Sequence, residues 1–199
     1  LAKTMNKYFW TKIEKLRKSI PNSTKDPLSS VRETMRGRTC KFQFRSVTEV
    51  EIKKTILAMK TSTATGIDWI DSNCLKVVVD IVAPAMTHIT NLSIASQTFP
   101  SSYKISKIIP LKKSLELSDM NCSSYRPVNL LPLPGKVIER AVFSQISEYL
   151  EGNRLLHFNH HGGRKSHSTA TALIQMYDRW VEEIEEGKLV GALMVDQSA

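Results

Sequence analysis

The sequence has few cysteines and no long apolar run, and each shortage excludes a class of protein. Cys40, Cys74 and Cys122 lie far apart, are odd in number and lack the spacing of metal ligands. They indicate free thiols in a reducing compartment, so no disulfide-linked partner is expected. No stretch approaches the roughly 20 apolar residues of a membrane span, and the mixed apolar and basic start is unlike a signal peptide. We therefore expect an intracellular protein, in the nucleus or the cytoplasm, without a membrane partner.

Acidic residues are also scarce: 19 Asp and Glu face 28 Lys and Arg, a formal net charge of +9. Most of the excess lies in residues 1–60, which hold fifteen basic and five acidic residues. A surface of this sign attracts polyanions, whether nucleic acid or acidic membrane. A basic run is also often only a solvated face, and both interpretations stay open for this segment. The length of 199 residues suffices for one sizeable core or two small ones.

Apolar spacing predicts helices over most of the first hundred residues. Residues 1–20 place an apolar face among lysines, and a loop rich in Pro and Ser follows. We treat residues 1–40 as a basic helical N-terminal extension. Thr48 and Glu51 form a capping box for a helix that is expected to reach about Lys60.

Three further signals mark helix starts and a loop before residue 100. Residues 61–68 form a polar loop around a glycine. Asp71 or Ser72 caps the next helix, and Pro84 suits the first turn of another.

Two short segments around a polar loop predict a β-hairpin. Residues 104–113 are mostly apolar or basic, and residues 125–131 form the second extended segment. Lys112 and Lys113 precede the loop, and Arg126 follows it. Phosphates favour charge-assisted donors, and the planar fork of arginine grips two phosphate oxygens at once. The alternative is a solvated hairpin rim.

A glycine-bearing loop follows a helix that Pro134 opens. Residues 162–169 read Gly-Gly-Arg-Lys-Ser-His-Ser-Thr, and Ser168 or Thr169 caps the next long helix. Glycines allow close approach of a phosphate, and a helix N-terminus favours anions. A Walker loop is excluded because Phe158 stands where its first glycine belongs and Arg164 where its lysine belongs. An ordinary capped loop is the alternative.

Four histidines gather in the same loop, at positions 157, 160, 161 and 167. They raise the possibility of a zinc site. Neither a cysteine nor a paired acid lies nearby at ligand spacing, so zinc is the less favoured interpretation.

The last apolar run, Leu189 to Val195, ends in Asp196. Its length predicts a strand buried on both faces, and carboxylates at strand tips are typical of ligand and catalytic groups. The alternative is that Asp196 begins an exposed turn. Two-metal phosphoryl transfer needs a second acidic residue from elsewhere, since one carboxylate cannot hold two divalent ions.

Taken in order, these residues resemble the reverse transcriptases of non-LTR (LINE-type) retrotransposons. The resemblance covers roughly residues 40–199. It rests on Thr65-Gly66-Ile67-Asp68, Phe99-Pro100, Tyr103-Lys104, Ile109-Pro110-Leu111, Lys113, Tyr125-Arg126-Pro127-Val128-Asn129-Leu130-Leu131, Lys136, Glu139-Arg140, His161-Gly162-Gly163-Arg164, Ser168-Thr169 and Met194-Val195-Asp196-Gln197-Ser198-Ala199.

The resemblance implies an α+β fold, a partial right-hand polymerase in which residues 41–199 form the fingers and the first palm strand. Asp196 would be a catalytic Mg²⁺ ligand, and Lys113 and Arg126 would contact the triphosphate of an incoming dNTP. Lys112, Arg164 and Lys165 would contact nucleic acid. The implied partners are an RNA template, a DNA primer and dNTP.

Two departures from that family's pattern bear on function. His160 and Gly163 stand where the family usually has Gln and Phe, and the chain begins with Leu and ends three residues after Asp196. We therefore expect a fragment of an RNA-directed DNA polymerase that is inactive as it stands. The alternatives are a non-catalytic basic module that binds RNA or DNA, and a helical interaction domain whose charge only confers solubility.

Overall fold

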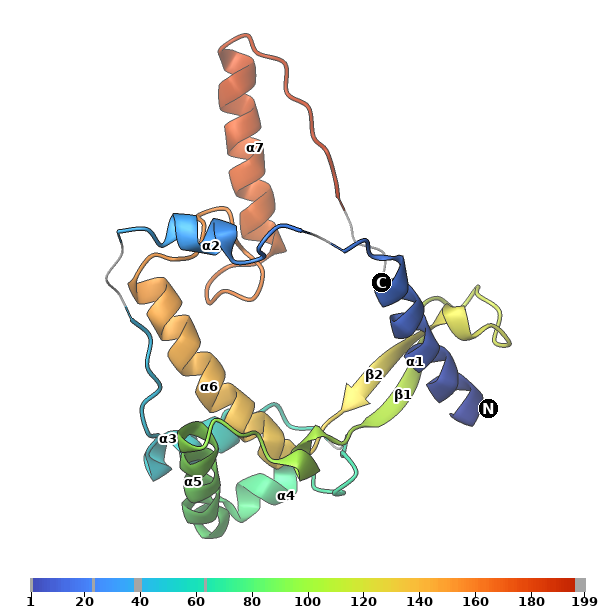
Figure 1. Ribbon diagram of the computed structural model, residues 1–199, viewed down its shortest axis with the longest axis vertical. Helices are drawn as coiled ribbons and strands as arrows, with labels where there is room; N and C mark the ends of the chain where they lie inside the picture. The colour runs from blue at the N-terminus through green and yellow to red at the C-terminus, as the bar shows by residue number, and fades with distance from the viewer. Residues whose placement is uncertain (1, 23, 38–40, 63, 196–199) are drawn as a thin grey trace. The chain divides into compact units, whose positions relative to one another are not determined.

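The computed structural model describes residues 2–22, 24–37, 41–62 and 64–195 (Figure 1). Its elements, in chain order, are α1 (Ala2–Ser19), α2 (Ser29–Thr34), α3 (Glu49–Leu57), α4 (Ser72–Val77), α5 (Val79–Ala95), the 3₁₀ helix η1 (Ser101–Lys104), β1 (Lys107–Lys112), the 3₁₀ helix η2 (Cys122–Ser124), β2 (Tyr125–Leu130), α6 (Leu133–Gly152) and α7 (Thr169–Glu185). The chain divides into two compact units, Leu1–Glu148 and Tyr149–Ala199. The described part is helix-rich with a two-stranded antiparallel sheet, which confirms the predicted α+β class.

The core of the first unit lies where α3, α4 and α5 meet the first half of α6 (Figure 1). Its fully buried side chains are Ile52 and Ile56 of α3, Ala83 of α5 and Val137 of α6. Burial of such apolar side chains is the main stabilising term, at about 1.5–3 kcal/mol for each Val, Leu or Ile. This core fixes the base from which the hairpin projects.

The predicted start of α3 is confirmed at atomic level. Glu51 N–H donates to Thr48 Oγ1 over 3.3 Å, and Thr48 N–H donates to Glu51 Oε2 over 2.8 Å. Val47, one residue before the cap, is buried. Because two orphan helix donors are satisfied reciprocally, this short sequence defines where the helix begins. The helix ends at Leu57, three residues earlier than expected.

Side-chain amides hold the extended segment before α3 in place. Gln145 of α6 accepts from Arg45 N–H over 2.9 Å and donates to the Arg45 carbonyl over 3.1 Å. Asn91 of α5 does the same to Val47, over 2.7 and 2.9 Å. Each amide thus satisfies both backbone groups of one residue, as a neighbouring strand would.

The hairpin is confirmed, with Lys112 opposite Tyr125 and Lys107 opposite Leu130. Lys113 N–H donates to the Ser124 carbonyl over 2.8 Å, which makes alternate pairs hydrogen-bonded. Pro110 and Pro127, which face each other, fall at a non-hydrogen-bonded pair. No ladder bond is therefore lost. Each proline instead removes an N–H from an outer edge of the hairpin, which blocks pairing with a further strand there.

The helix start predicted at Pro84 is wrong. The break falls at Val78, between α4 and α5, and Pro84 lies inside α5. The predicted cap of the preceding helix is confirmed, because Asp71 Oδ1 accepts from Cys74 N–H over 2.7 Å. Pro84 disrupts only one turn near the helix start, and the buried Ala83 and Met86 on either side hold that turn in the core.

The prediction of a buried strand at residues 189–195 is also wrong. Residues 189–195 form no strand, and their apolar side chains are exposed, with Leu193 at 88%. A strand buried on both faces needs neighbours on both edges. The two strands of the described part pair only with each other, so this run has no partner there.

Ser168, one of the two predicted capping residues, is the N-cap of α7. Its hydroxyl accepts from Thr171 N–H over 3.2 Å, and Ser168 N–H donates to Thr171 Oγ1 over 2.8 Å. No α7 side chain is buried. Across the described residues, no helix has the length and apolarity to span a bilayer.

Candidate nucleotide and nucleic-acid contacts

The hairpin separates its three predicted cations onto two faces. Side chains alternate along a strand, so Lys113 and Arg126 share one face and Lys112 lies on the other. Lys113 and Arg126 are both exposed, and neither side chain has a hydrogen-bond or ion-pair partner among the described residues. The structure thus brings together the two cations that were expected to contact the same triphosphate.

Lys112, the third predicted cation, is engaged within the hairpin loop. Its Nζ lies 2.6 Å from Asp119 Oδ1 and donates to the Leu115 carbonyl over 3.1 Å. Tyr125 Oη donates to the Asp119 carbonyl over 3.1 Å. The hydrogen bond and charge of Lys112 lower the pKa of the Asp119 carboxyl, with a smaller contribution from Tyr125. Lys112 therefore shapes the loop, and Asp119 neutralises its charge locally.

Lys107 joins the face of Lys113 and Arg126, from the far end of β1. Its Nζ lies 5.0 Å from the centroid of the Trp69 ring, in a cation–π contact. Trp69 belongs to the loop that precedes α4. Sequence reasoning missed this pair, because no local pattern links residues 38 positions apart.

Gly66 explains how that loop reaches the hairpin. A Cβ at this position would lie 2.9 Å from Pro132 N and 3.0 Å from the Leu131 carbonyl carbon. These atoms belong to the backbone at the exit of β2, which has no room to move aside. Only glycine permits so close an approach, so the Thr65-to-Asp68 motif attaches this loop to the hairpin.

In the second unit, the side chain of Arg164 forms all its hydrogen bonds within the protein. Its Nε and one terminal nitrogen each donate over 2.7 Å to Glu151, at the end of α6. The other terminal nitrogen donates to the carbonyls of His157 and His160. The paired hydrogen bond raises the pKa of Arg164 and lowers the pKa of Glu151. Arg164 thus ties the glycine-bearing loop to α6, while the side chain of Lys165 beside it is exposed and has no hydrogen-bond or ion-pair partner within the described ranges.

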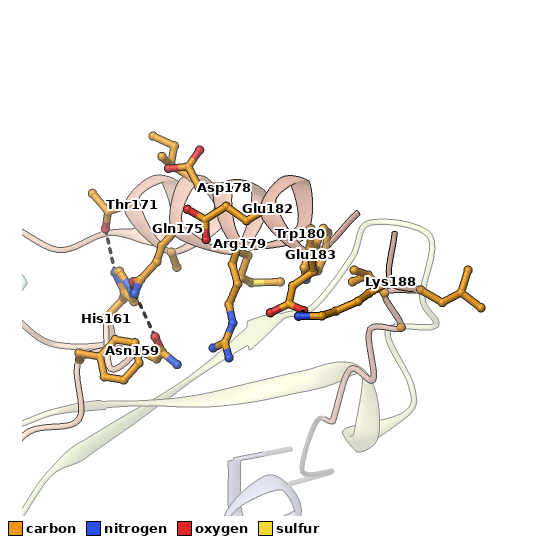
Figure 2. Close-up of a pocket in the computed structure, with 17 residues that line it drawn as sticks. Asn159, His161, Thr171, Gln175, Asp178, Arg179, Trp180, Glu182, Glu183 and Lys188 are labelled. Atoms are coloured by element: carbon orange, nitrogen blue, oxygen red, sulfur yellow. Dashed lines mark hydrogen bonds and ion pairs between the residues drawn. The ribbon is translucent and has the colours of Figure 1, made fainter. Parts of the chain in front are cut away.

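One histidine of the loop, His161, contacts two side chains of α7. His161 lies 3.0 Å from Thr171 Oγ1 through Nδ1 and 2.6 Å from Gln175 Oε1 through Nε2. Gln175 in turn donates to Asn159 over 3.0 Å, and Figure 2 shows this chain at one end of a groove along α7. The groove has a volume of about 1070 Å³. The histidine chain therefore fastens the loop to α7.

Asp196 lies outside the described residues. In the part that the structure describes, no three His, Cys, Asp or Glu side chains are placed to hold a metal ion. The described residues therefore do not form a magnesium site on their own.

Comparison with known proteins relates the chain to RNA-directed DNA polymerases of non-LTR retrotransposons, which confirms the resemblance found from the sequence. The "RNA-directed DNA polymerase from mobile element jockey" of Drosophila funebris is 27% identical over 150 residues, 75% of this chain and 16% of that protein. The Drosophila melanogaster jockey protein is 26% identical over 155 residues, 77% of this chain and 17% of the relative. The "Probable RNA-directed DNA polymerase from transposon BS" of Drosophila melanogaster is 23% identical over 146 residues, which are 73% of this chain and 16% of that protein.

The chain thus spans about a sixth of the length of these curated relatives. No protein-family model matches the chain.

Proposed function

We propose that the chain is the fingers and first palm segment of a non-LTR retrotransposon reverse transcriptase. It would contribute contacts to RNA template, DNA primer and dNTP in a longer protein. The observation that carries this proposal is the shared, exposed face of Lys113 and Arg126 on the hairpin. Two cations two residue pairs apart on one sheet face lie within reach of a single triphosphate.

The contribution of this face to catalysis would be electrostatic. Guanidinium and ammonium groups that are fixed before the substrate arrives neutralise phosphate charge without reorganisation. By resemblance, Asp196 supplies one carboxylate to a Mg²⁺ site of the complete polymerase. The remaining acidic groups would come from the rest of the longer protein, since the matched part is a sixth of the relatives.

Binding of a fluorescent dNTP to the 199-residue chain tests the proposed face. We expect Arg126→Gln to weaken binding on the order of tenfold, and Arg126→Gln with Lys113→Gln to weaken it further, because charge-assisted bonds to phosphate are lost. Lys54→Gln, an exposed lysine of α3, gives the same charge change as a matched control. Equal binding by the double variant and the control would remove the triphosphate role.

A primer-extension assay tests whether the 199-residue chain is active without the rest of the longer protein. With Mg²⁺, primer-template and dNTP, the 199-residue chain should incorporate no nucleotide, because polymerisation is proposed to need the longer protein. Detectable incorporation would show that the segment is catalytically complete.

The second candidate is a non-catalytic module that binds RNA or DNA. It is favoured by the net charge of +9 and by the exposed Lys165 beside the glycines. RNA retention on filters that falls steeply with salt, together with no dNTP binding, would support this candidate.

A further inference from the structure

A second groove lies in the first unit, between the end of α3, the loop after it and the first half of α6. Its volume is about 690 Å³. On α6 it is lined by Lys136, Arg140 and Phe143. These residues are spaced four and three apart, so they lie along one stripe of the helix. Leu133, three residues before Lys136, is buried and continues this stripe into the core. The stripe is therefore held on a rigid element.

The groove carries an excess of positive charge. Lys60 joins Lys136 and Arg140, and Glu139 is the one carboxylate among the described residues of its lining. In that described part, none of the three cations forms an ion pair. They differ in this from Lys112, which is paired with Asp119. With three cations and one carboxylate, the lining has a net positive charge, which suits a phosphate chain.

An aromatic ring lies among these cations. Phe143 is 50% exposed, and the Arg140 guanidinium carbon lies 6.0 Å from its ring centroid. Exposed aromatic rings next to arginine are typical platforms for unpaired bases. A base can stack on the ring while the phosphates on either side of it contact the cations. A duplex cannot do so, since its bases are stacked on each other.

The opposite wall of the groove is held in place. Ser72, which is 2% exposed, accepts from Ser62 N–H over 2.8 Å and donates to the Ser62 carbonyl over 3.1 Å. The loop that carries Lys60 is therefore closed onto the start of α4. A ligand does not need to order this wall, which lowers the entropic cost of binding.

We propose that this groove binds a single-stranded segment of nucleic acid, with phosphates on Lys60, Lys136 and Arg140 and one base stacked on Phe143. The inference rests on the proposed function and extends it. It assigns a strand-binding surface that shares no residue with the hairpin face. The neutral hydroxyl and apolar lining gives no base-specific pattern, so binding is expected to tolerate any sequence.

Fluorescence anisotropy with a labelled single-stranded RNA of about 12 nucleotides tests the assignment. Lys136→Gln and Arg140→Gln should each weaken binding roughly three- to tenfold and lower the slope of log Kd against log salt by about 0.7. Phe143→Leu should weaken binding on the order of tenfold with the salt slope unchanged, because stacking is not ionic. Glu139→Gln should strengthen binding, since it removes the negative charge of the groove.

Lys54→Gln serves again as the charge-matched control, and circular dichroism confirms that each variant is folded. If Lys136→Gln, Arg140→Gln and Phe143→Leu all bind RNA like Lys54→Gln, the groove is not the site, although the proposed function survives. If the unmodified chain does not bind RNA at low salt, both proposals fall. A duplex RNA of equal length that binds as tightly as the single strand would overturn the stacking role of Phe143.

Discussion

Two arginines that were both predicted to be site residues, Arg126 and Arg164, have different roles in the structure. Arg126 was expected to contact the triphosphate of a nucleotide, and Arg164 was expected to contact nucleic acid. Arg126 is exposed on the hairpin, without a partner in the described residues. Arg164 directs all three nitrogens of its guanidinium to Glu151 and to two backbone carbonyls.

The difference shows that a basic motif does not by itself indicate an available cation. Whether a cation is free depends on whether the fold places a carboxylate close enough to pair with it. Glu151 is 13 residues before Arg164, at the end of a helix, and Asp119 is seven residues after Lys112 across a loop. Arg126 has no such neighbour in the described chain. Substitutions can therefore distinguish a cation that is free to bind phosphate from one that already pairs with a carboxylate of the protein.

Loss of the Arg164 fork should give the largest effect. Arg164→Gln removes the paired bond to Glu151 and the bonds to two loop carbonyls, so the loop from residue 157 to 167 should open more often. We expect limited proteolysis within this loop to be faster by on the order of tenfold. Lys165→Gln is the matched control, since it removes a neighbouring charge that holds nothing. Equal cleavage rates for the two variants would mean that Arg164 does not hold the loop.

Release of Lys112 from Asp119 should give a smaller effect, namely stronger binding of RNA. Asp119→Asn removes its partner and leaves a third free cation on the hairpin. Binding of single-stranded RNA should strengthen about threefold, and the salt slope should rise by about 0.7, as one more phosphate contact becomes possible. Asp80→Asn, which removes a carboxylate that pairs with Lys53 of α3, is the control. An identical gain in both variants would reflect net charge alone.

Features encoded within a few residues could be predicted from the sequence. The capping boxes of α3 and α7 each need only four residues, and the hairpin needs two extended segments on either side of a polar loop. Their hydrogen bonds close locally, so the sequence pattern and the structure agree.

Features that depend on distant partners could not be predicted. The apolar run at 189–195 has the composition of a buried strand, but burial requires adjacent strands that the described chain does not provide. Trp69 meets Lys107, and Lys60 meets the α6 stripe, only because the core of α3, α4, α5 and α6 brings them together. Whether each cation is free to bind phosphate could not be predicted either, because it depends on the position of a carboxylate elsewhere in the fold.

The pH dependence of the Arg164 fork gives the smallest and most local effect. The arginine lowers the pKa of Glu151 below its ordinary value of 4.5. A carboxyl whose pKa is depressed on folding stabilises the fold above the unfolded-state pKa. That contribution is lost as the pH falls through the lower, folded-state pKa.

The Arg164 Nε–H signal in proton–nitrogen NMR spectra should therefore stay constant from pH 7 to pH 5 and shift only below pH 4.5. In Glu151→Gln the signal should be shifted at every pH and should not titrate. Glu51, which Arg45 and the backbone of Thr48 hold at a pKa of about 2, offers an internal comparison in the first unit. Its carboxyl should remain ionised at pH 3, so the Arg45 Nε–H signal should show no transition above that pH. A transition of the Arg164 signal above pH 5 would mean that the fork does not stabilise the ionised form of Glu151, and the contrast between a committed and an available arginine would lose its electrostatic basis.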